Sequence, residues 1–320
     1  MKKIISVLCI AILLMSLSAC GNSGSGDAGT TTGGGEKVAF DAQINHIQAN
    51  AWYTYGLKAD GTLIASSEPF IDGDNVVKTL PDCLTWTGVQ NFSSGSEAVA
   101  AVLEDGSVVM CGGLVDETQN CDFDAVSGWK DVVQIAMGKR DIVALKSDGS
   151  VEIAGMLQTK DIGDNTGFVQ VEAECEPMGV KADGSVVIWN WGWDDSVEEA
   201  AQWTDIKSIS SCWNHIVGLK SDGTVVACGN NDFGQCDVGE WTDIVAVSAG
   251  MDYTLGLKSD GTVVACGQSD AGACDVGNWS DVVEIDAGYY HSVGICSDGS
   301  VLTAGSNNLG QCNTDGWKLK

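Results

Sequence analysis

Basic residues, proline and histidine are all scarce in this 320-residue sequence. Lys and Arg total 16 against 44 Asp and Glu, which gives a formal net charge of −28, and Pro and His occur three times each. Proteins bind nucleic acids largely through Lys and Arg contacts to phosphates, so this balance argues against a nucleic-acid partner. Hydrophobic residues still make up 44% of the chain. That content suffices for a packed core and excludes the class of disordered acidic proteins.

The motifs of common catalytic and metal sites are also missing. The sequence has no Cys-x2-Cys or His-x3-His motif, so no zinc site is predicted. No Gly-x-Ser-x-Gly elbow stands at a strand-to-helix turn. His215 and His291 occupy a repeat position that holds Tyr53 and Tyr253 in other copies. This indicates a packing and hydrogen-bonding role, and we predict no catalytic residue, no metal and no cofactor.

The beginning of the chain predicts export and anchoring. Lys2 and Lys3 precede an apolar run, 4–14, which is too short to span a bilayer. The following segment, Leu17-Ser-Ala-Cys20, resembles a bacterial lipobox, in which Cys20 is lipidated and becomes the mature N-terminus. The alternative is an ordinary secretory signal that carries a cysteine near its cleavage site.

The predicted division of the chain follows from this leader. Residues 1–19 are the signal peptide, 20–36 the lipidated cysteine with a Gly, Ser and Thr tether, and 37–320 the folded domain. We expect the protein in a bacterial cell envelope, facing outward from the cytoplasmic membrane and held there by its lipid anchor only.

One unit recurs seven times after the tether. Trp203-Thr-Asp-Ile and Trp241-Thr-Asp-Ile each lead to Gly-Leu-Lys-Ser-Asp-Gly-Thr-Val-Val-Ala-Cys-Gly. An Asp-Gly turn marks every copy, at Asp60, Asp105, Asp148, Asp183, Asp222, Asp260 and Asp298. Self-similarity at a spacing of this order is the signature of a repeat architecture.

Each unit is rich in short β-strand patterns. Residues 244–247, 254–258 and 262–266 are alternating or β-branched, and 235–238 reads as a fourth strand. Seven such units predict an all-β, seven-bladed β-propeller of four-stranded antiparallel blades; a β-solenoid is the alternative. The last segment, 317–320, begins an eighth unit that residues 38–50 complete, so the two ends are expected to share one blade and close the ring.

Two segments resemble a known family. Ala-Gly-x-x-Tyr-Thr-Leu-Gly-Leu-Lys-Ser-Asp-Gly-Thr-Val from Ala249 and Gly-x-Asn-x-x-Gly-Gln-Cys from Gly229 resemble the regulator-of-chromosome-condensation repeat in its short bacterial form, over about residues 38–317. The family's eukaryotic founder is a nuclear exchange factor that contacts chromatin, and no segment here matches an exchange wedge. A secreted bacterial β-lactamase-inhibitor protein has the same fold, so the resemblance implies a ring that can bind proteins outside the cell.

The cysteines leave two possibilities open. Export would permit disulfides, and three blades hold a cysteine pair across a predicted hairpin, whereas the alternative is that the cysteines fill small apolar positions. The candidate pairs are Cys111 with Cys121, Cys228 with Cys236, and Cys266 with Cys274. A bridge between Cys175 and Cys212, which fall in equivalent loops of neighbouring blades, is a further possibility.

Loop tips on one face are the candidate binding residues. The loops after the first and third strands share a face, and the tips of the first set differ in every copy while the frame repeats. Their content includes residue types enriched at interface centres. The candidates for a partner-binding face are Trp52, Lys139, Arg140, Trp191, Trp193, Trp213, Met251, Tyr289 and Tyr290.

The sequence is compatible with two functions. The first is a non-catalytic, surface-anchored module that binds a protein partner through this face. The second is a carbohydrate-directed protein, either a glycan binder or a polysaccharide-active enzyme; for the enzyme, acidic pairs such as Glu198-Glu199 are candidates, although they are more typical of a solvated loop.

Overall fold

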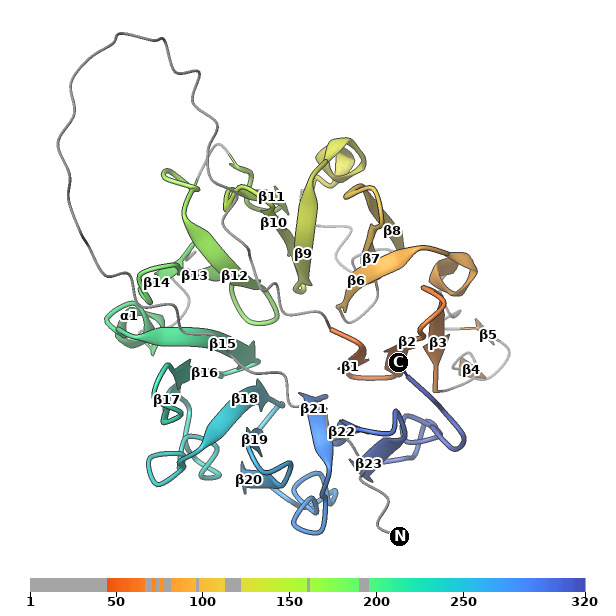
Figure 1. Cartoon of the computed structure of the whole chain (residues 1–320), viewed down its shortest axis with the longest axis vertical. Coiled ribbons are helices and arrows are strands. Elements are labelled where there is room, and N and C mark those ends of the chain that lie inside the picture. Colours follow the sequence, from red (N-terminus) through yellow and green to blue (C-terminus); the bar gives the residue numbers. More distant parts are fainter. Residues whose placement is uncertain are drawn as a thin grey trace, which may run out of the picture. The chain divides into compact units, whose positions relative to one another are not determined.

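Seven three-stranded antiparallel sheets follow one another around a central axis (Figure 1). The computed structural model describes residues 45–66, 71–72, 75–76, 82–95, 98–112, 122–159, 162–189 and 196–319. The predicted signal peptide, Cys20 and the tether lie outside these residues. The ring confirms the predicted all-β, seven-bladed propeller and excludes the solenoid.

The first three blades are β1 (Ile47–Ala49), β2 (Thr54–Leu57) and β3 (Leu63–Ala65); β6 (Val89–Ser94), β7 (Ala98–Leu103) and β8 (Val108–Gly112); and β9 (Val132–Met137), β10 (Asp141–Lys146) and β11 (Val151–Gly155). The next two are β12 (Phe168–Glu172), β13 (Met178–Lys181) and β14 (Val186–Ile188); and β15 (Ile206–Cys212), β16 (His215–Lys220) and β17 (Val225–Gly229). The last two are β18 (Ile244–Ala249), β19 (Tyr253–Lys258) and β20 (Val263–Gly267); and β21 (Val282–Ala287), β22 (His291–Cys296) and β23 (Val301–Gly305).

Shorter elements lie between the blades. A two-stranded hairpin, β4 (Ile71–Asp72) with β5 (Asn75–Val76), follows the first blade. The connections also contain the 3-10 helices η1 (Asp82–Thr85) and η2 (Asp124–Gly128) and one short α-helix, α1 (Ser196–Ala200). None of these was expected from the sequence, because each is too short to show a period.

The prediction of four strands per blade is wrong. Residues 235–238 form tight turns instead: Asp237 N donates to Gly234 O, and Val238 N donates to Cys236 O. Asn231 Oδ1 also accepts from Cys236 N at 2.8 Å, which holds the segment in a coil. Val238 is buried, as the apolar pattern of the segment predicts. The backbone groups of Val238, however, form hydrogen bonds locally rather than to a neighbouring strand.

The Asp-Gly turns are the most regular feature of the ring. In the fifth blade Asp222 Oδ1 accepts from Thr224 N at 3.0 Å and from Thr224 Oγ1 at 2.6 Å, and Gly223 has φ 82°. A hairpin with a bulge requires a left-handed backbone conformation at this position, and glycine adopts this conformation most easily. Gly223 O then accepts from Ile244 N, the first residue of the next blade, so each turn also fixes its neighbour.

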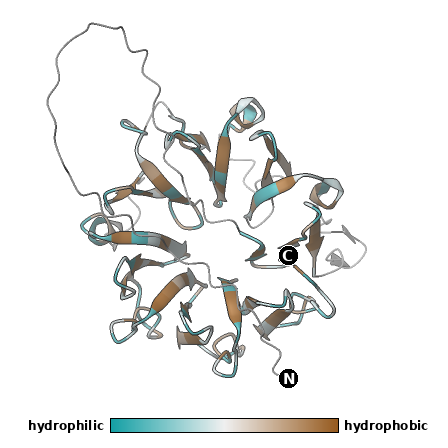
Figure 2. Cartoon of the chain, in the orientation of Figure 1, coloured by the Kyte–Doolittle hydropathy of each residue, from teal (hydrophilic) through white to brown (hydrophobic). Residues whose placement is uncertain are grey.

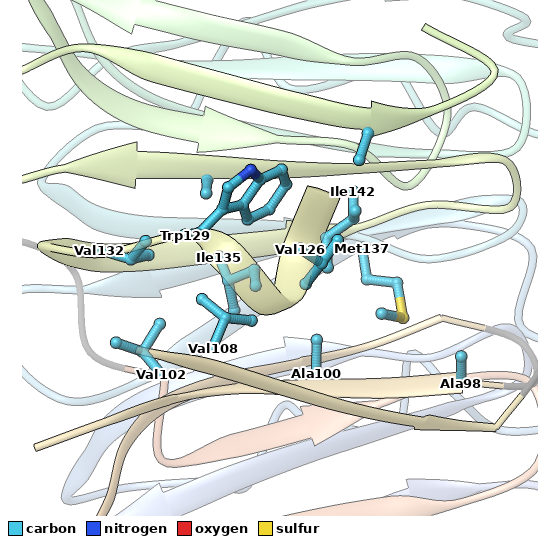
Figure 3. Packing of buried hydrophobic residues seen from close by; sticks show 12 residues of the cluster. Ala98, Ala100, Val102, Val108, Val126, Trp129, Val132, Ile135, Met137 and Ile142 are labelled. Carbon is cyan, nitrogen blue, oxygen red and sulfur yellow. The ribbon is translucent and has the colours of Figure 1, made fainter. Parts of the chain in front are cut away.

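Hydrophobic side chains fill the seams between blades. Figure 2 shows the strands as mostly hydrophobic and the connecting loops as mostly hydrophilic. At the seam of the second and third blades Val102 and Val108 pack with Ile135 (Figure 3). Val126 of η2 and Trp129, which directly follows η2, belong to the same cluster. Among the tryptophans that open the repeats, Trp129, Trp279 and Trp317 are buried. Trp86, Trp203 and Trp241 are half-buried against the clusters of their own seams, so all six help to pack the blades.

The innermost strands are linked by side chains, all the way around the channel. In each link a polar side chain of one blade accepts a hydrogen bond from a backbone N–H of the next. The bonds are Gln48 Oε1 from Ser94 N (2.7 Å), Ser93 Oγ from Met137 N (3.0 Å), Gln134 Oε1 from Val171 N (3.1 Å), Gln170 Oε1 from Ile209 N (2.8 Å), Ser210 Oγ from Ala249 N (3.0 Å), Ser248 Oγ from Ala287 N (3.0 Å) and Asp286 Oδ2 from Ala49 N (2.6 Å). Most of the polar channel lining is thus used to join the blades, because these strand edges have no backbone partner.

The two ends of the described chain meet in the first blade, as the repeat pattern predicted. Leu319 N donates to Gly299 O at 3.0 Å, which repeats the bond from Ile244 to Gly223. Leu319 is fully buried with Ile47 and Val293, and a Cβ on Gly56 would lie 2.7 Å from its side chain. Residues 317–319 therefore supply the start of the first blade, which closes the ring.

Candidate functional site

Four of the predicted binding residues meet at one mouth of the channel. They come from the third, fifth and seventh blades, and we call them the channel-mouth cluster: Lys139, Trp213, Tyr289 and Tyr290. Lys139 Nζ lies 3.5 Å from the centroid of the Trp213 ring. Trp213 and Tyr289 pack edge to face with centroids 6.2 Å apart, and Tyr289 packs in the same way on Tyr290 at 6.4 Å.

Trp213 is the most unusual residue of this cluster. Its side chain is 49% exposed, and Tyr290 is 47% exposed. Its backbone has φ 53°, in the left-handed region; elsewhere in the described ranges only Asp and Gly adopt positive φ. A bulky residue in this region carries backbone strain, and such strain concentrates at binding sites.

The other predicted binding residues have different positions. Trp52 is half-buried and packs against the core of the first two blades, so it covers a seam as well as facing the surface. Arg140 and Met251 are half-buried in their loops. Trp191 and Trp193 lie outside the described residues.

Three carboxyl groups lie in the channel behind the cluster. Glu172, Glu174 and Asp286 line a cavity of about 110 Å³ together with Tyr289. Burial raises the pKa of Glu172 to about 7, of Glu174 to about 8 and of Asp286 to about 7. The charges of Glu172 and Asp286 further raise the pKa of Glu174, and the charge of Glu172 further raises the pKa of Asp286. Each keeps some exposed surface in the channel, but protein surrounds it on all sides, which removes most of its hydration.

Two of these carboxyl groups, Asp286 and Glu172, accept hydrogen bonds from neighbouring residues. Asp286 accepts from Ala49 N and, at 3.0 Å, from Ser248 Oγ, so it joins the seventh blade to both neighbours. Glu172 Oε1 accepts from Glu174 N at 3.1 Å. Our interpretation of the sequence did not select these groups, although the sequence contains one signal. Glu172 and Asp286 occupy a first-strand position that is a serine, Ser210 or Ser248, in two other copies of the repeat.

The buried histidines have the packing role that the repeat position predicted. His215 and His291 are fully buried, and their Nε2 atoms lie 2.9 Å from the hydroxyls of Thr254 and Thr54 in the next blade. The Thr254 hydroxyl donates to Gln235 O, so the ring nitrogen is the donor to the threonine. Burial lowers the pKa of both histidines to about 4, which keeps them neutral.

Of the cysteines in the candidate disulfides, those at positions 111, 236, 266 and 274 are thiols, Cys228 is buried in its blade, and Cys121 lies outside the described residues. The thiol of Cys111 contacts that of Cys83 from η1, across the seam of the first two blades. Cys175 Sγ donates to Trp213 O at 3.4 Å, close to buried Cys212. The disulfide pairings stay predictions.

The described part of the chain has neither a metal-binding cluster nor a membrane-spanning helix. No group of three or more His, Cys, Asp or Glu side chains there is arranged to hold a metal ion. No helix among the same residues is long and apolar enough to cross a membrane.

Comparison with known proteins identifies the repeat. The model of the regulator of chromosome condensation (RCC1) repeat matches residues 206–235 and 282–311, which are the fifth and seventh blades. Two of the seven blades thus match the RCC1 repeat, and the chain as a whole has the fold of a seven-bladed β-propeller. No curated protein matches its sequence.

Similar solved structures show the fold of this propeller alone, because their sequence identity is low. Prp20p from Saccharomyces cerevisiae, studied for its binding to Gsp1p and histones, is 17% identical with a TM-score of 0.59, covering 85% of this chain and 84% of its own. The CRINKLY WD40 ectodomain of the Arabidopsis thaliana receptor kinase ACR4 is 17% identical with a TM-score of 0.59, covering 86% and 99%. The ectodomain of the Physcomitrella patens receptor kinase CR4 is 16% identical with a TM-score of 0.59, covering 82% and 73%.

Proposed function

We propose that this RCC1-repeat propeller is a non-catalytic binding module, anchored by lipidated Cys20 at the outer side of a bacterial cytoplasmic membrane, whose channel-mouth cluster binds a protein partner. The observation that carries the proposal is Trp213, a half-exposed aromatic residue held in a left-handed conformation. It stacks with residues of two other blades, so the surface is pre-organised by the whole ring. Pre-organised aromatic anchors reduce the entropy cost of binding.

The size of the cavity behind the channel-mouth cluster supports a protein rather than a carbohydrate partner at this face. The channel cavity measures about 110 Å³, whereas pockets for small-molecule ligands measure about 300–1,000 Å³. Exposed Trp and Tyr rings can also stack on sugars, which is why a glycan remains the alternative outcome. Glu198 and Glu199, the acidic pair considered for glycoside cleavage, are exposed on α1.

Replacing Trp213 of the cluster together with Arg140, the neighbour of Lys139 in the same loop, should remove partner capture. We expect Trp213→Ala with Arg140→Ala to weaken capture about tenfold or more, because aromatic and Arg anchors dominate interface energies. The measurement is capture by the immobilised full-length protein from the organism's own envelope fraction, with melting curves for each variant.

Two controls accompany this measurement. Phe233→Ala removes an equally exposed aromatic, 50% exposed, outside the cluster and should leave capture unchanged. Asp222→Ala loosens an Asp-Gly turn and should lower the melting temperature without altering the binding surface. If Trp213→Ala unfolds the protein or spares capture, the cluster is not the binding face; capture of a glycan alone would support the carbohydrate alternative.

The anchoring part of the proposal has its own test. Cys20→Ala removes the thiol that would carry the lipid, so we expect the protein to leave the membrane fraction, which cell fractionation and immunoblotting measure. If the Cys20→Ala protein has lost its signal peptide and still stays in the membrane fraction, the lipid anchor is contradicted.

A further inference from the structure

A second pocket lies beside the channel-mouth cluster, at the loops of the sixth and seventh blades. Its volume is about 130 Å³, and its wall is mostly apolar, formed in part by Ala271, Ala273, Tyr289 and Tyr290. Tyr289 belongs to both sites and packs against Trp213 and Tyr290, so the pocket continues the proposed binding face.

The charged groups of this pocket are two carboxylates, Asp252 and Asp270. Asp252 Oδ1 accepts from Asn214 Nδ2 at 3.3 Å, and Asp270 Oδ2 accepts from Gln268 Nε2 at 2.9 Å. Both partners are uncharged amides. Across the residues that the structure describes, no Lys, Arg or His forms an ion pair with either carboxylate. The pocket therefore combines an apolar wall with two negative charges that have no counter-ion.

The dimensions and the charge point to one kind of occupant. A volume of 130 Å³ is far below the range of small-molecule sites and suits a single side chain. A long basic side chain has an apolar stem, which can lie along alanine and tyrosine surface, and a charged end that seeks anions. We propose that this pocket receives an arginine or lysine side chain of the protein partner, with the stem against Tyr290 and the charge between Asp252 and Asp270.

The same face already contains an example of this recognition. Lys139 Nζ sits 3.5 Å from the centroid of the Trp213 ring, in a cation–π contact between two blades. The formal net charge of −28 also attracts cationic segments over longer distances. This inference rests on the proposed function, since it names the chemistry of the partner at that face.

The test uses a small probe, so it does not depend on finding the partner. The full-length protein is labelled with 3-fluorotyrosine, and the Tyr290 signal is assigned in the fluorine NMR spectrum by loss in Tyr290→Phe. N-acetyl-arginine methylamide is titrated, with N-acetyl-citrulline methylamide as its uncharged match. We expect the arginine probe to shift the Tyr290 signal saturably and the citrulline probe to bind about fivefold more weakly or not at all, because two partly exposed charge contacts contribute about 1 kcal/mol together.

Variants decide which groups are responsible. Asp252→Asn with Asp270→Asn should remove the preference for arginine over citrulline, whereas Asp237→Asn, a carboxylate in the coil after the fifth blade, should keep it. Equal shifts from both probes, or an unchanged preference in the double variant, would overturn the pocket's assignment. If partner capture does not depend on Trp213 but the preference for the arginine probe over the citrulline probe is observed, the proposed function is wrong and the assignment of the pocket still holds.

Discussion

Deleting residues 317–320 should lower the free energy of unfolding by about 5 kcal/mol, because burying one Leu and one Trp contributes about 2–5 kcal/mol each. For a domain of this size that corresponds to a fall in melting temperature of about 10 °C or more. Leu319 is fully buried and Trp317 nearly so, and both pack over Gly56. The deletion also removes the bond from Leu319 N to Gly299 O and exposes a strand edge.

Single substitutions keep this prediction testable if the truncated chain fails to fold. Leu319→Ala should cost about 2–4 kcal/mol through the cavity it leaves. Lys318→Ala is the matched control, since its side chain is 58% exposed in a surface ion pair with Asp298, which contributes at most about 1 kcal/mol. Equal melting temperatures for Leu319→Ala and Lys318→Ala would show that the ring does not depend on this closure.

The second large effect is a loss of stability as pH rises from 6.5 to 8.0. The folded chain holds protons on Glu172, Glu174 and Asp286 up to their raised pKa values of about 7, 8 and 7. The unfolded chain has released those protons by about pH 5. Because the folded state binds more protons in this window, its free energy of unfolding falls as pH rises. Allowing for the channel exposure of the groups, we expect a fall of about 2 kcal/mol.

The two buried histidines set the lower limit, pH 6.5, of the pH range in which this loss of stability is expected. His215 and His291 have pKa values lowered to about 4, so below about pH 6.5 the unfolded chain binds protons there and the effect opposes that of the carboxyls. Denaturant unfolding at pH 6.5, 7.2 and 8.0 measures the slope.

A pair of amide variants isolates the channel groups. Glu174→Gln should remove about half of the pH dependence, because this residue has the highest of the three pKa values. Glu198→Gln changes an exposed carboxyl on α1 and should leave the slope unchanged. A wild-type curve that is flat from pH 6.5 to 8.0 would mean that these carboxyls are ionised at little cost in the folded ring.

The site was only partly visible in the sequence. Variation among the loop tips singled out Lys139, Trp213, Tyr289 and Tyr290, because the frame repeats and these positions do not. That the four side chains touch depends on how strands from the third, fifth and seventh blades converge on one axis. Asp270, from a loop after a third strand, lies next to Tyr290 for the same reason.

The sequence by itself determined the number of blades, the Asp-Gly hairpins and the closing of the ring by residues 317–319. Each of these follows from a local pattern: glycine at a left-handed turn, alternating strands, and a unit split between the two ends. The tertiary structure alone decided that residues 235–238 coil instead of forming a strand, since Asn231 supplies their hydrogen bonds. It alone also placed Glu172, Glu174 and Asp286 in one enclosed channel, because their shared burial depends on blades far apart in the chain.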